Sequence, residues 1–487
     1  MKKNLLIAGL ILIAGLGWSS DWMLTKADMK YVGGFRLPKG SAGKGKNDHF
    51  AFSPGVIAYD TQRNSFFAAG HGYAKAIAEI SYPGLTDSVD ISKFPRAVYI
   101  QNFRNLLDGL PSGNPDKVGV IGGLYAEKGA ILFTAFQYYD APAKVRDAFG
   151  VVKDSGKLAS SALDGYFETG YGAHTAGWVT AIPEEYRESL KGTHIIGAGK
   201  SQPIASRWPL RPTAFSFTWP KDNIFKDPLP VNRLMDGSLK DQLPKEMWQN
   251  ALDSANYGII IPGTRTYICF GNRGGMHSKI GYKITTDDGR LAGGYAAQDD
   301  DDHYMYYWMF KVDDLIKSAQ GRIAPVKVLP YERGKLALPF VSSGGGGIGG
   351  GSWDPKTKTV FLCLKGRDRA SQYSILPAIV GVQFEKYKGK DTTAPYGTMT
   401  EPNNGKKVKG QIPIEAHAID NVDKENELKV QFTVNSKDHN KPATEFPFRI
   451  DWDTSKVANG KYILSAIAVD KAGNKRKLND VAVTVEN

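Results

Sequence analysis

Along the chain, apolar runs of strand length alternate with short polar turns. Four paired runs stand out, and each pair has a short turn (TQRN, EKG, PGT or PKTK) between its halves. The pairs occupy residues 56–70, 123–136, 258–271 and 351–364. Two short apolar runs joined by a tight polar turn are typical of antiparallel β-hairpins, so we expect four hairpins here.

The hairpins recur at intervals of tens of residues within residues 28–388. This spacing favours the inner strands of the blades of a β-propeller. At about 50 residues per blade, the length corresponds to seven blades. Seven clear copies are not visible, so five or six blades remain open, as does a β-sandwich or a β-helix array. The predicted fold class is all-β, with the propeller in residues 21–390.

A different pattern begins near residue 391. Clean alternation of apolar and polar positions runs through residues 412–421 and again through residues 462–470. The sequences DWDT (451–454) and DKAGN (470–474) resemble the bacterial immunoglobulin-like modules appended to many secreted proteins. The resemblance covers residues 391–487 and implies a small β-sandwich that spaces, anchors or binds sugar.

The first residues have the pattern of a secretory signal. Lys2 and Lys3 precede a run of about a dozen apolar residues, and small residues follow at Ser19 and Ser20. The run is shorter than the ~20 residues that a membrane span needs, although an uncleaved anchor remains the alternative. We therefore expect a signal peptide in residues 1–20, a secreted protein and no transmembrane segment after cleavage.

Charge is distributed unevenly between the two predicted domains. The net charge is +12, but residues 391–487 contain 14 basic and 14 acidic residues, so the excess lies in the first 390 residues. A basic secreted domain attracts anionic partners, which outside the cell are mostly acidic polysaccharides, although the charge can also serve solubility alone. No nucleic-acid-binding module is recognisable, so we expect no nucleic acid partner, and we expect a monomer. The two cysteines, Cys269 and Cys363, are expected to be buried free thiols, although an exported location also permits a disulfide.

The large domain also resembles a family of exported bacterial propeller-like proteins. The matching segments include YVGGFRLP (31–38), GHG (70–72) and AIPEEY (181–186). This resemblance implies the fold and an exported location, but no settled activity. Secreted propeller polysaccharide lyases, such as ulvan lyases, are a functional analogy; they cleave uronate polymers by β-elimination.

Four residues match the chemistry of such a lyase by type and spacing. β-Elimination needs a cation or donor that neutralises the uronate carboxylate, a base that removes the C5 proton and an acid that protonates the leaving oxygen. His174 and His194 lie about twenty residues apart, and Tyr257 and Arg273 lie about sixteen apart, as in the lyases. We assign Arg273 and one histidine to the carboxylate and Tyr257 to proton transfer. The alternative is that all four are ordinary structural or surface residues.

Other residues are candidates for substrate or metal binding. His71 is predicted to bind substrate because it ends a hairpin where loops would open toward a propeller mouth, and Arg207 and Trp208 because the aromatic ring could stack on a sugar. The acidic run that ends at Asp302 and His303 could hold Ca²⁺, or could join His277 in a Zn²⁺ site; a solvated loop is the alternative. The proposed chemistry requires no cofactor.

Together these features predict a secreted polysaccharide lyase that acts on an acidic, ulvan-like polysaccharide. A non-catalytic carbohydrate-binding or adhesive protein is the first alternative. A propeller glycoside hydrolase is the second, and it would need two carboxylates that face each other across a cleft.

Overall fold

The computed structural model describes most of the chain after the predicted signal peptide. The described residues are 21–111, 113–142, 144–146, 148–199, 208–209, 211–237, 253–278, 284–285, 291–292, 302–340, 346–371 and 374–487. The predicted signal peptide therefore lies outside them. In this part of the chain β-strands dominate, and the one α-helix is α1 (Val312–Ala319).

Five four-stranded antiparallel sheets form the large domain. Sheet 1 contains β2 (Ile57–Asp60), β3 (Ser65–Ala69), β4 (Ala76–Ser81) and β5 (Tyr99–Asn105). Sheet 2 contains β6 (Val120–Glu127), β7 (Ala130–Phe136), β8 (Ala148–Val152) and β9 (Leu163–Phe167). Sheet 3 contains β10 (Val179–Ala181), β11 (His194–Ile196), β12 (Ala214–Phe217) and β13 (Asn232–Met235).

The last two sheets contain the longest strands. Sheet 4 contains β14 (Ser254–Ile260), β15 (Thr266–Gly274), β18 (His303–Lys311) and β19 (Pro330–Lys335). Sheet 5 contains β20 (Ile348–Asp354), β21 (Thr359–Ser371), β22 (Ser374–Phe384) and the N-terminal strand β1 (Met29–Arg36), which pairs with β22. A separate two-stranded sheet joins β16 (Ile284–Thr285) and β17 (Leu291–Ala292).

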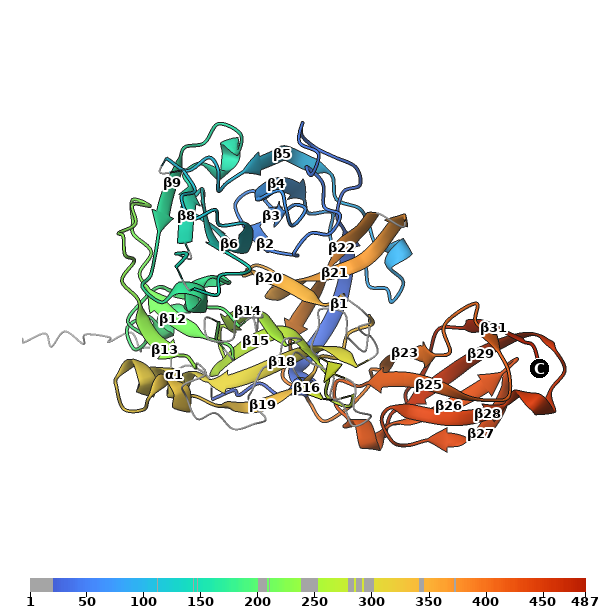
Figure 1. Cartoon of the computed structure of the whole chain (residues 1–487). Coiled ribbons are helices and arrows are strands. Elements are labelled where there is room, and N and C mark those ends of the chain that lie inside the picture. The colour runs from blue at the N-terminus through green and yellow to red at the C-terminus, as the bar shows by residue number, and fades with distance from the viewer. Residues whose placement is uncertain are drawn as a thin grey trace, which may run out of the picture.

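In each sheet one strand, called here its first strand, contacts the corresponding strand of the next sheet. The first strands are β2, β6, β10, β14 and β20. β2 contacts β6, β6 contacts β10, β10 contacts β14, and β20 contacts both β14 and β2. Figure 1 shows the sheets set around a common centre. Apolar side chains fill the space between neighbouring sheets; Phe67 of sheet 1 and Phe133 of sheet 2, for example, belong to one buried cluster.

The first strands also begin at the same end of the domain. Gly55, before β2, lies beside Gly349 of β20, and farther along Tyr59 bonds to Ser352 (2.8 Å). Contacts that advance together show that these neighbouring strands run in the same direction. We call the end where the first strands begin the entry end and the opposite one the far end. Because the strands of each sheet alternate in direction, the connection from second to third strand also lies at the entry end.

All four predicted hairpins are confirmed as β2–β3, β6–β7, β14–β15 and β20–β21. The described residues form five four-stranded sheets, however, two fewer than the seven blades expected from length. The first strands begin at residues 57, 120, 179, 254 and 348, so the repeats are longer than the assumed 50 residues. Long connections between strands account for the difference.

The C-terminal segment forms two packed sheets, as its alternation predicts. One sheet contains β23 (Tyr396–Glu401), β25 (Gln411–Ile419) and β28 (Phe448–Asp453). The other contains β24 (Lys407–Val408), β26 (Lys429–Val434), β27 (Lys437–Ala443), β29 (Gly460–Val469), β30 (Lys475–Lys477) and β31 (Val481–Val485). Their facing side chains form one apolar core that includes Phe432 and Trp452.

The two domains meet through a buried lysine. The Lys335 ammonium pairs with Glu425 (2.7 Å) and lies 3.4 Å from the Phe446 ring centroid and 3.7 Å from that of Tyr304. Each ring offers a cation its negative face, so this contact joins sheet 4 to the C-terminal domain. Both cysteines of the large domain are buried and free, as expected. Among the helices of the described residues, none has the length and apolar character of a membrane span.

Candidate functional site

Two basic side chains of β21 lie at the entry end without an acidic partner among the described residues. β21 pairs with β20 as far as Leu364, and the Lys365 N–H donates to the Gly347 carbonyl (2.8 Å). The strand then continues beyond β20, with Arg367 two residues on, and pairs again with β22 from Asp368. The neighbouring acid, Asp368, pairs instead with Arg96 (2.7 Å).

Arg367 is partly exposed as a whole, but its Nε and Nη2 atoms are buried and have no hydrogen-bond partner among the described residues. Burial alone lowers its pKa to about 10. Burial also lowers the pKa of Lys365, and no carboxylate of the described residues contributes to either shift. A buried cation without a counter-charge is costly, so the pair is suited to receive an anion from solution.

Glycines allow this arrangement. A side chain at Gly346 would place its Cβ 3.2 Å from the Arg367 guanidinium carbon, so the guanidinium lies directly against the backbone. Gly55 has φ of +79°, and a Cβ there would lie 3.3 Å from the Lys365 Cγ. Only glycine combines that left-handed conformation with so close an approach.

An aromatic cluster adjoins the two cations. The Phe52 N–H donates to Ile375 of β22 (3.1 Å), which holds the segment before Gly55 against sheet 5. The His71 ring lies 5.9 Å from Phe52 and 5.3 Å from Tyr73. Phe52 is 54% exposed and Tyr73 is 84% exposed. The predicted substrate-binding residue His71 therefore lies between two exposed aromatic rings, and burial, with His49 nearby, lowers its pKa.

More exposed aromatic side chains lie at the same end. Tyr138 and Tyr139 belong to the connection from β7 to β8, and Tyr171 to the segment that leads into β10. With Phe52 and Tyr73 they are the strongly exposed aromatic residues of the described chain. Their gathering at one end is notable, since exposed rings offer flat faces on which sugar rings can stack.

His174 also lies at the entry end, in the short turn Gly172–Thr175 before β10. Its Nδ1 is 2.6 Å from Asp236 Oδ1, and Arg233 Nε is 2.8 Å from the other oxygen of the same carboxylate. Burial raises the pKa of Asp236, but the hydrogen bond from His174 and the charges of His174 and Arg233 outweigh it, so the pKa is below its usual value. A carboxylate on Nδ1 orients the ring and makes Nε2 the acceptor in the neutral form.

Of the other three predicted catalytic residues, His194 lies at the far end and Tyr257 lies in the core. His194 pairs with Ala181 at the far end of β10, and its Nε2 lies 2.7 Å from Glu127. Burial lowers the pKa of His194 despite Glu127, so the neutral ring donates to that carboxylate. Tyr257 is 3% exposed in the core, and burial raises its pKa well above the usual range.

Arg273 lies at the entry end of β15. Its guanidinium lies over Tyr306 (5.5 Å to the ring centroid), and its Nε is 3.8 Å from Asp253. The side chain of the preceding residue, Asn272, bonds to Ile348 at the start of β20, so Arg273 stands near the sheet that contains Lys365.

The remaining predicted residues have mainly structural surroundings. Trp208 is buried against Phe136, so it offers no surface for sugar stacking, and Arg207 lies outside the described residues. Asp302 Oδ2 accepts bonds from the backbone of His277 (2.8 Å) and Ser278 (2.7 Å), as a loop cap does. His303 opens β18 opposite Gly274. Within the described residues, these three predicted metal ligands do not form a metal-binding cluster.

The sequence interpretation passed over Lys365, Arg367, Phe52 and Tyr73. The signal for the cations was the sequence LCLKGRDR, in which two basic residues directly follow a fully apolar run. Such residues usually extend into solvent, and only the fold shows that they are partly buried and unpaired.

Comparisons with known proteins identify the C-terminal domain. A search among curated proteins finds no match to the chain. Among solved structures, the fibronectin(III)-like modules of Clostridium thermocellum CbhA are 24% identical, over 18% of this chain and 93% of theirs, with a TM-score of 0.16. The Thermotoga petrophila endo-β-1,4-mannanase is 17% identical, over 20% of this chain and 21% of its own, with a TM-score of 0.17.

The extracellular domain of BT3049 from B. thetaiotaomicron matches a larger share of the chain. It is 9% identical over 93% of this chain and 57% of its own length, with a TM-score of 0.27. All three scores are too low to establish a shared fold. Residues 389–466 match the family model of the bacterial Ig domain, so the C-terminal domain is an immunoglobulin-like module of the bacterial type.

Proposed function

We propose that this is an exported protein that binds an acidic, uronate-containing polysaccharide at the entry end, and that its five sheets are the blades of a five-bladed β-propeller. The sequential contacts of the first strands support the propeller. The observation that carries the binding proposal is the pair Lys365 and Arg367, partly buried without counter-charges beside exposed aromatic rings.

The chemistry of such a polymer matches this surface. A uronate presents a carboxylate at each sugar, and a guanidinium binds a carboxylate through two parallel N–H···O bonds. Arg367 is partly exposed as a whole, and its guanidinium has no such bond on Nε or Nη2 within the described residues. The flat faces of Phe52 and Tyr73 can pack against the sugar rings between the charged groups.

Binding to polymers of known charge tests the proposal. Alginate, pectate and ulvan should bind the mature protein, whereas neutral dextran should not, and binding should weaken with rising salt. Lys365→Met and Arg367→Met each remove one charge at similar volume and should weaken binding by about tenfold, or ~1.4 kcal/mol. Lys93→Met, in an exposed turn at the far end, is the matched control and should bind normally.

Absence of binding to every acidic polymer would overturn the proposal. If Lys93→Met and Arg367→Met both bound more weakly than wild type and to the same extent, net charge rather than this site would determine affinity.

Cleavage of the polymer is the second candidate function, and the His174–Asp236 contact favours it. In β-elimination, Nε2 of His174 would take the C5 proton while a cation at the entry end neutralises the uronate carboxylate. The electrons of the C5–H bond then form the C4–C5 double bond, the C4–O bond breaks, and the leaving oxygen takes a proton from water, while His174 releases its proton to solvent.

A rise in ultraviolet absorbance from the unsaturated uronate product tests this candidate. A rise that disappears in His174→Gln while polymer binding persists would support it. No rise on any polymer that the protein binds leaves the binding function and refutes the lyase.

A further inference from the structure

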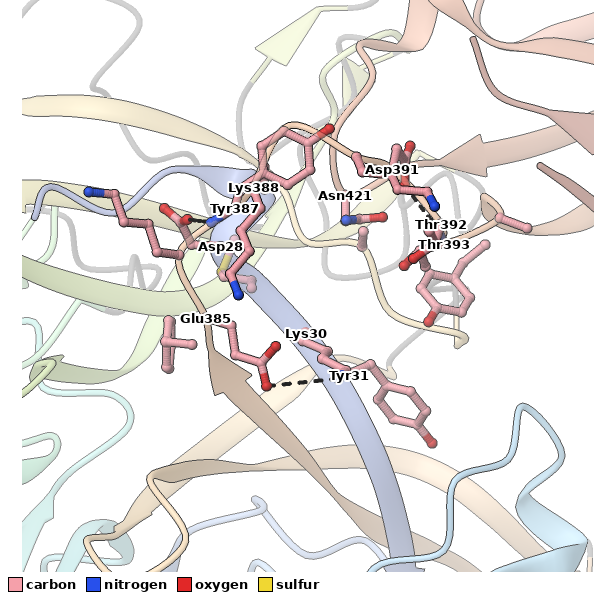
Figure 2. Close-up of a pocket in the computed structure, with 18 of the residues that line it drawn as sticks. Asp28, Lys30, Tyr31, Glu385, Tyr387, Lys388, Asp391, Thr392, Thr393 and Asn421 are labelled. Carbon is pink, nitrogen blue, oxygen red and sulfur yellow. Dashed lines mark hydrogen bonds and ion pairs between the residues drawn. The ribbon is translucent and has the colours of Figure 1, made fainter. Parts of the chain in front are cut away.

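Three acidic side chains come together where the linker meets the C-terminal domain. Asp391 lies in the linker between β22 and β23, and Asp420 and Asp423 follow β25. One carboxylate oxygen from each lies within 4.8 Å of the others. Figure 2 shows Asp391 beside Asn421 on the wall of a cleft of 970 Å³ between the two domains.

Several oxygens in this cluster have no hydrogen-bond donor. Asp420 is 1% exposed; its Oδ1 accepts from the N–H groups of Val422 (2.7 Å) and Asp423 (2.8 Å), which fixes the side chain. Its Oδ2 is buried and has no partner among the described residues. The same holds for Asp391 Oδ2 and Asn421 Oδ1. Buried oxygens left without a donor can be satisfied by a bound cation.

The charge of Lys26 acts on Asp391 and Asp420, but its ammonium does not hydrogen-bond to their unpaired oxygens. Its ammonium donates to the backbone carbonyl of Asp423 (2.5 Å). One ammonium also leaves the charge of three carboxylates incompletely balanced. Burial raises the pKa of Asp391 and of Asp420, and neighbouring acids raise both values further.

We propose that Asp391, Asp420 and Asp423 bind a Ca²⁺ ion that fixes the linker to the C-terminal domain. Carboxylate and amide oxygens are the ligands that Ca²⁺ takes, and Asn421 offers one more. Because Lys26 belongs to the large domain and bonds to Asp423, an ion here also stiffens the junction between the domains. The proposal is independent of polysaccharide binding.

Calorimetric titration with CaCl₂ of the whole mature protein, stripped with EGTA, tests binding. One ion should bind, and Asp420→Asn should weaken binding by at least about tenfold, because one charged ligand is lost. Asp438→Asn, which removes an exposed carboxylate of the same domain, should bind Ca²⁺ as wild type does.

Thermal unfolding separates a lost ligand from a damaged fold. In EGTA, Asp420→Asn should unfold at the same temperature as wild type or higher, since it relieves repulsion between carboxylates. Only wild type and Asp438→Asn should gain stability when Ca²⁺ is added. A variant that is less stable in EGTA would show that Asp420 is structural and overturn the proposal.

Limited trypsin digestion measures the junction. Lys386, Lys388 and Lys390 are exposed in the linker directly before Asp391, and Ca²⁺ should slow cleavage there in wild type but not in Asp420→Asn. No calorimetric binding, or Ca²⁺ binding that Asp420→Asn leaves unchanged, would refute the site.

Discussion

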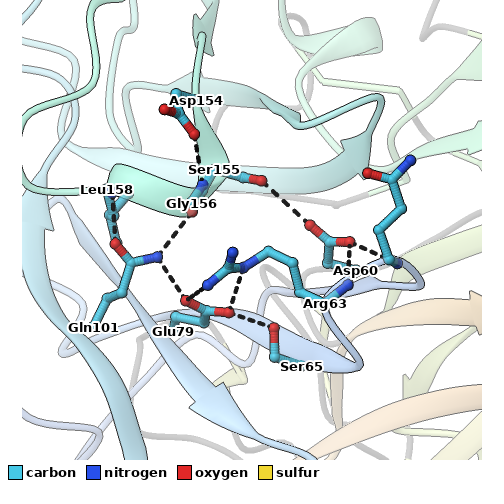
Figure 3. A network of polar contacts seen from close by, with 10 residues as sticks. Asp60, Arg63, Ser65, Glu79, Gln101, Asp154, Ser155, Gly156 and Leu158 are labelled. Atoms are coloured by element: carbon cyan, nitrogen blue, oxygen red, sulfur yellow. Dashed lines mark hydrogen bonds and ion pairs between the residues drawn. The ribbon is translucent and has the colours of Figure 1, made fainter.

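Two buried charges at opposite ends of the large domain have opposite surroundings. At the far end, Glu79 is fully buried, yet both its oxygens are satisfied (Figure 3). Arg63 contacts it through Nε (2.7 Å) and Nη2 (3.0 Å), and Ser65 and Gln101 also donate to it. At the entry end, Arg367 has buried nitrogen atoms with no such partner.

The difference separates a structural role from a binding role. Gln101 also donates to the Ser155 carbonyl (2.8 Å), so the Glu79 network joins sheet 1 to sheet 2. A network satisfied within the chain holds neighbouring sheets together. Unpaired cations do not link sheets in this way. The hydrogen bonds and ion pairs that they do not make within the chain are available to a ligand.

Removal of the charge on Glu79 should have the largest effect on stability. Glu79→Gln keeps the shape but gives Arg63 and Gln101 a neutral partner, and the free energy of unfolding should fall by about 3 kcal/mol. Chemical denaturation measures this loss. Glu385→Gln, which removes one partner of the exposed Lys30–Glu385 pair (3.8 Å), should leave stability almost unchanged. Equal losses in both variants would contradict the contrast.

The stability lost in Glu79→Gln should depend on pH, and the pKa of Glu79 in the wild type sets the direction of that dependence. Burial raises the pKa of Glu79, but the hydrogen bonds from Arg63, Ser65 and Gln101 lower it by a larger amount. The pKa is therefore below its usual 4.5. Glu79 therefore stabilises the fold above the unfolded pKa, and this contribution is lost as pH falls through the folded pKa. The stability gap between wild type and Glu79→Gln should narrow in acid, and a gap that widens there would refute the assignment.

At the entry end the corresponding change should leave stability intact. Arg367→Met replaces an uncompensated cation by an apolar side chain, so the free energy of unfolding should stay constant or rise by about 1 kcal/mol. Denaturation without polysaccharide measures it, with Arg63→Met as the matched control at the far end. A loss for Arg367→Met as large as that for Arg63→Met would show that Arg367 has a structural partner.

Much of the fold was accessible from sequence because its hairpins are local. β2–β3 and β14–β15 combine apolar strands with a tight turn, and this pattern needs no distant information. Sheet 3 was missed because β10 and β11 have three residues each, too few for a visible period. The pairing of β1 with β22 joins the two ends of the large domain, and no local pattern reveals it.

The site was less accessible because it depends on which end of a strand a residue occupies. His174 and His194 match by type and spacing, but the antiparallel pairing of β10 with β11 places them at opposite ends of sheet 3. Lys365 and Arg367 differ from ordinary surface cations in being partly buried with no carboxylate of the described residues nearby, and that is a property of the assembled sheets. The sequence therefore showed which residue types were present, whereas only the fold showed at which end of the domain each of them lies.

The smallest expected effect concerns the aromatic part of the entry end. Tyr73 is 84% exposed, so Tyr73→Ala should leave the unfolding transition in place. It should nevertheless weaken binding of an acidic polysaccharide by about fivefold, or ~1 kcal/mol, because a sugar ring loses one stacking face. Ile224→Ala, an equally exposed change in the β12–β13 connection at the far end, should bind as wild type does.

The salt dependence of binding separates the two parts of the site. The slope of affinity against salt concentration should stay at its wild-type value in Tyr73→Ala, since no charge is lost, whereas Arg367→Met should reduce this slope. A reduced slope in Tyr73→Ala would mean that the ring acts by positioning the cations, and the entry end would then be one electrostatic site without a separate stacking surface.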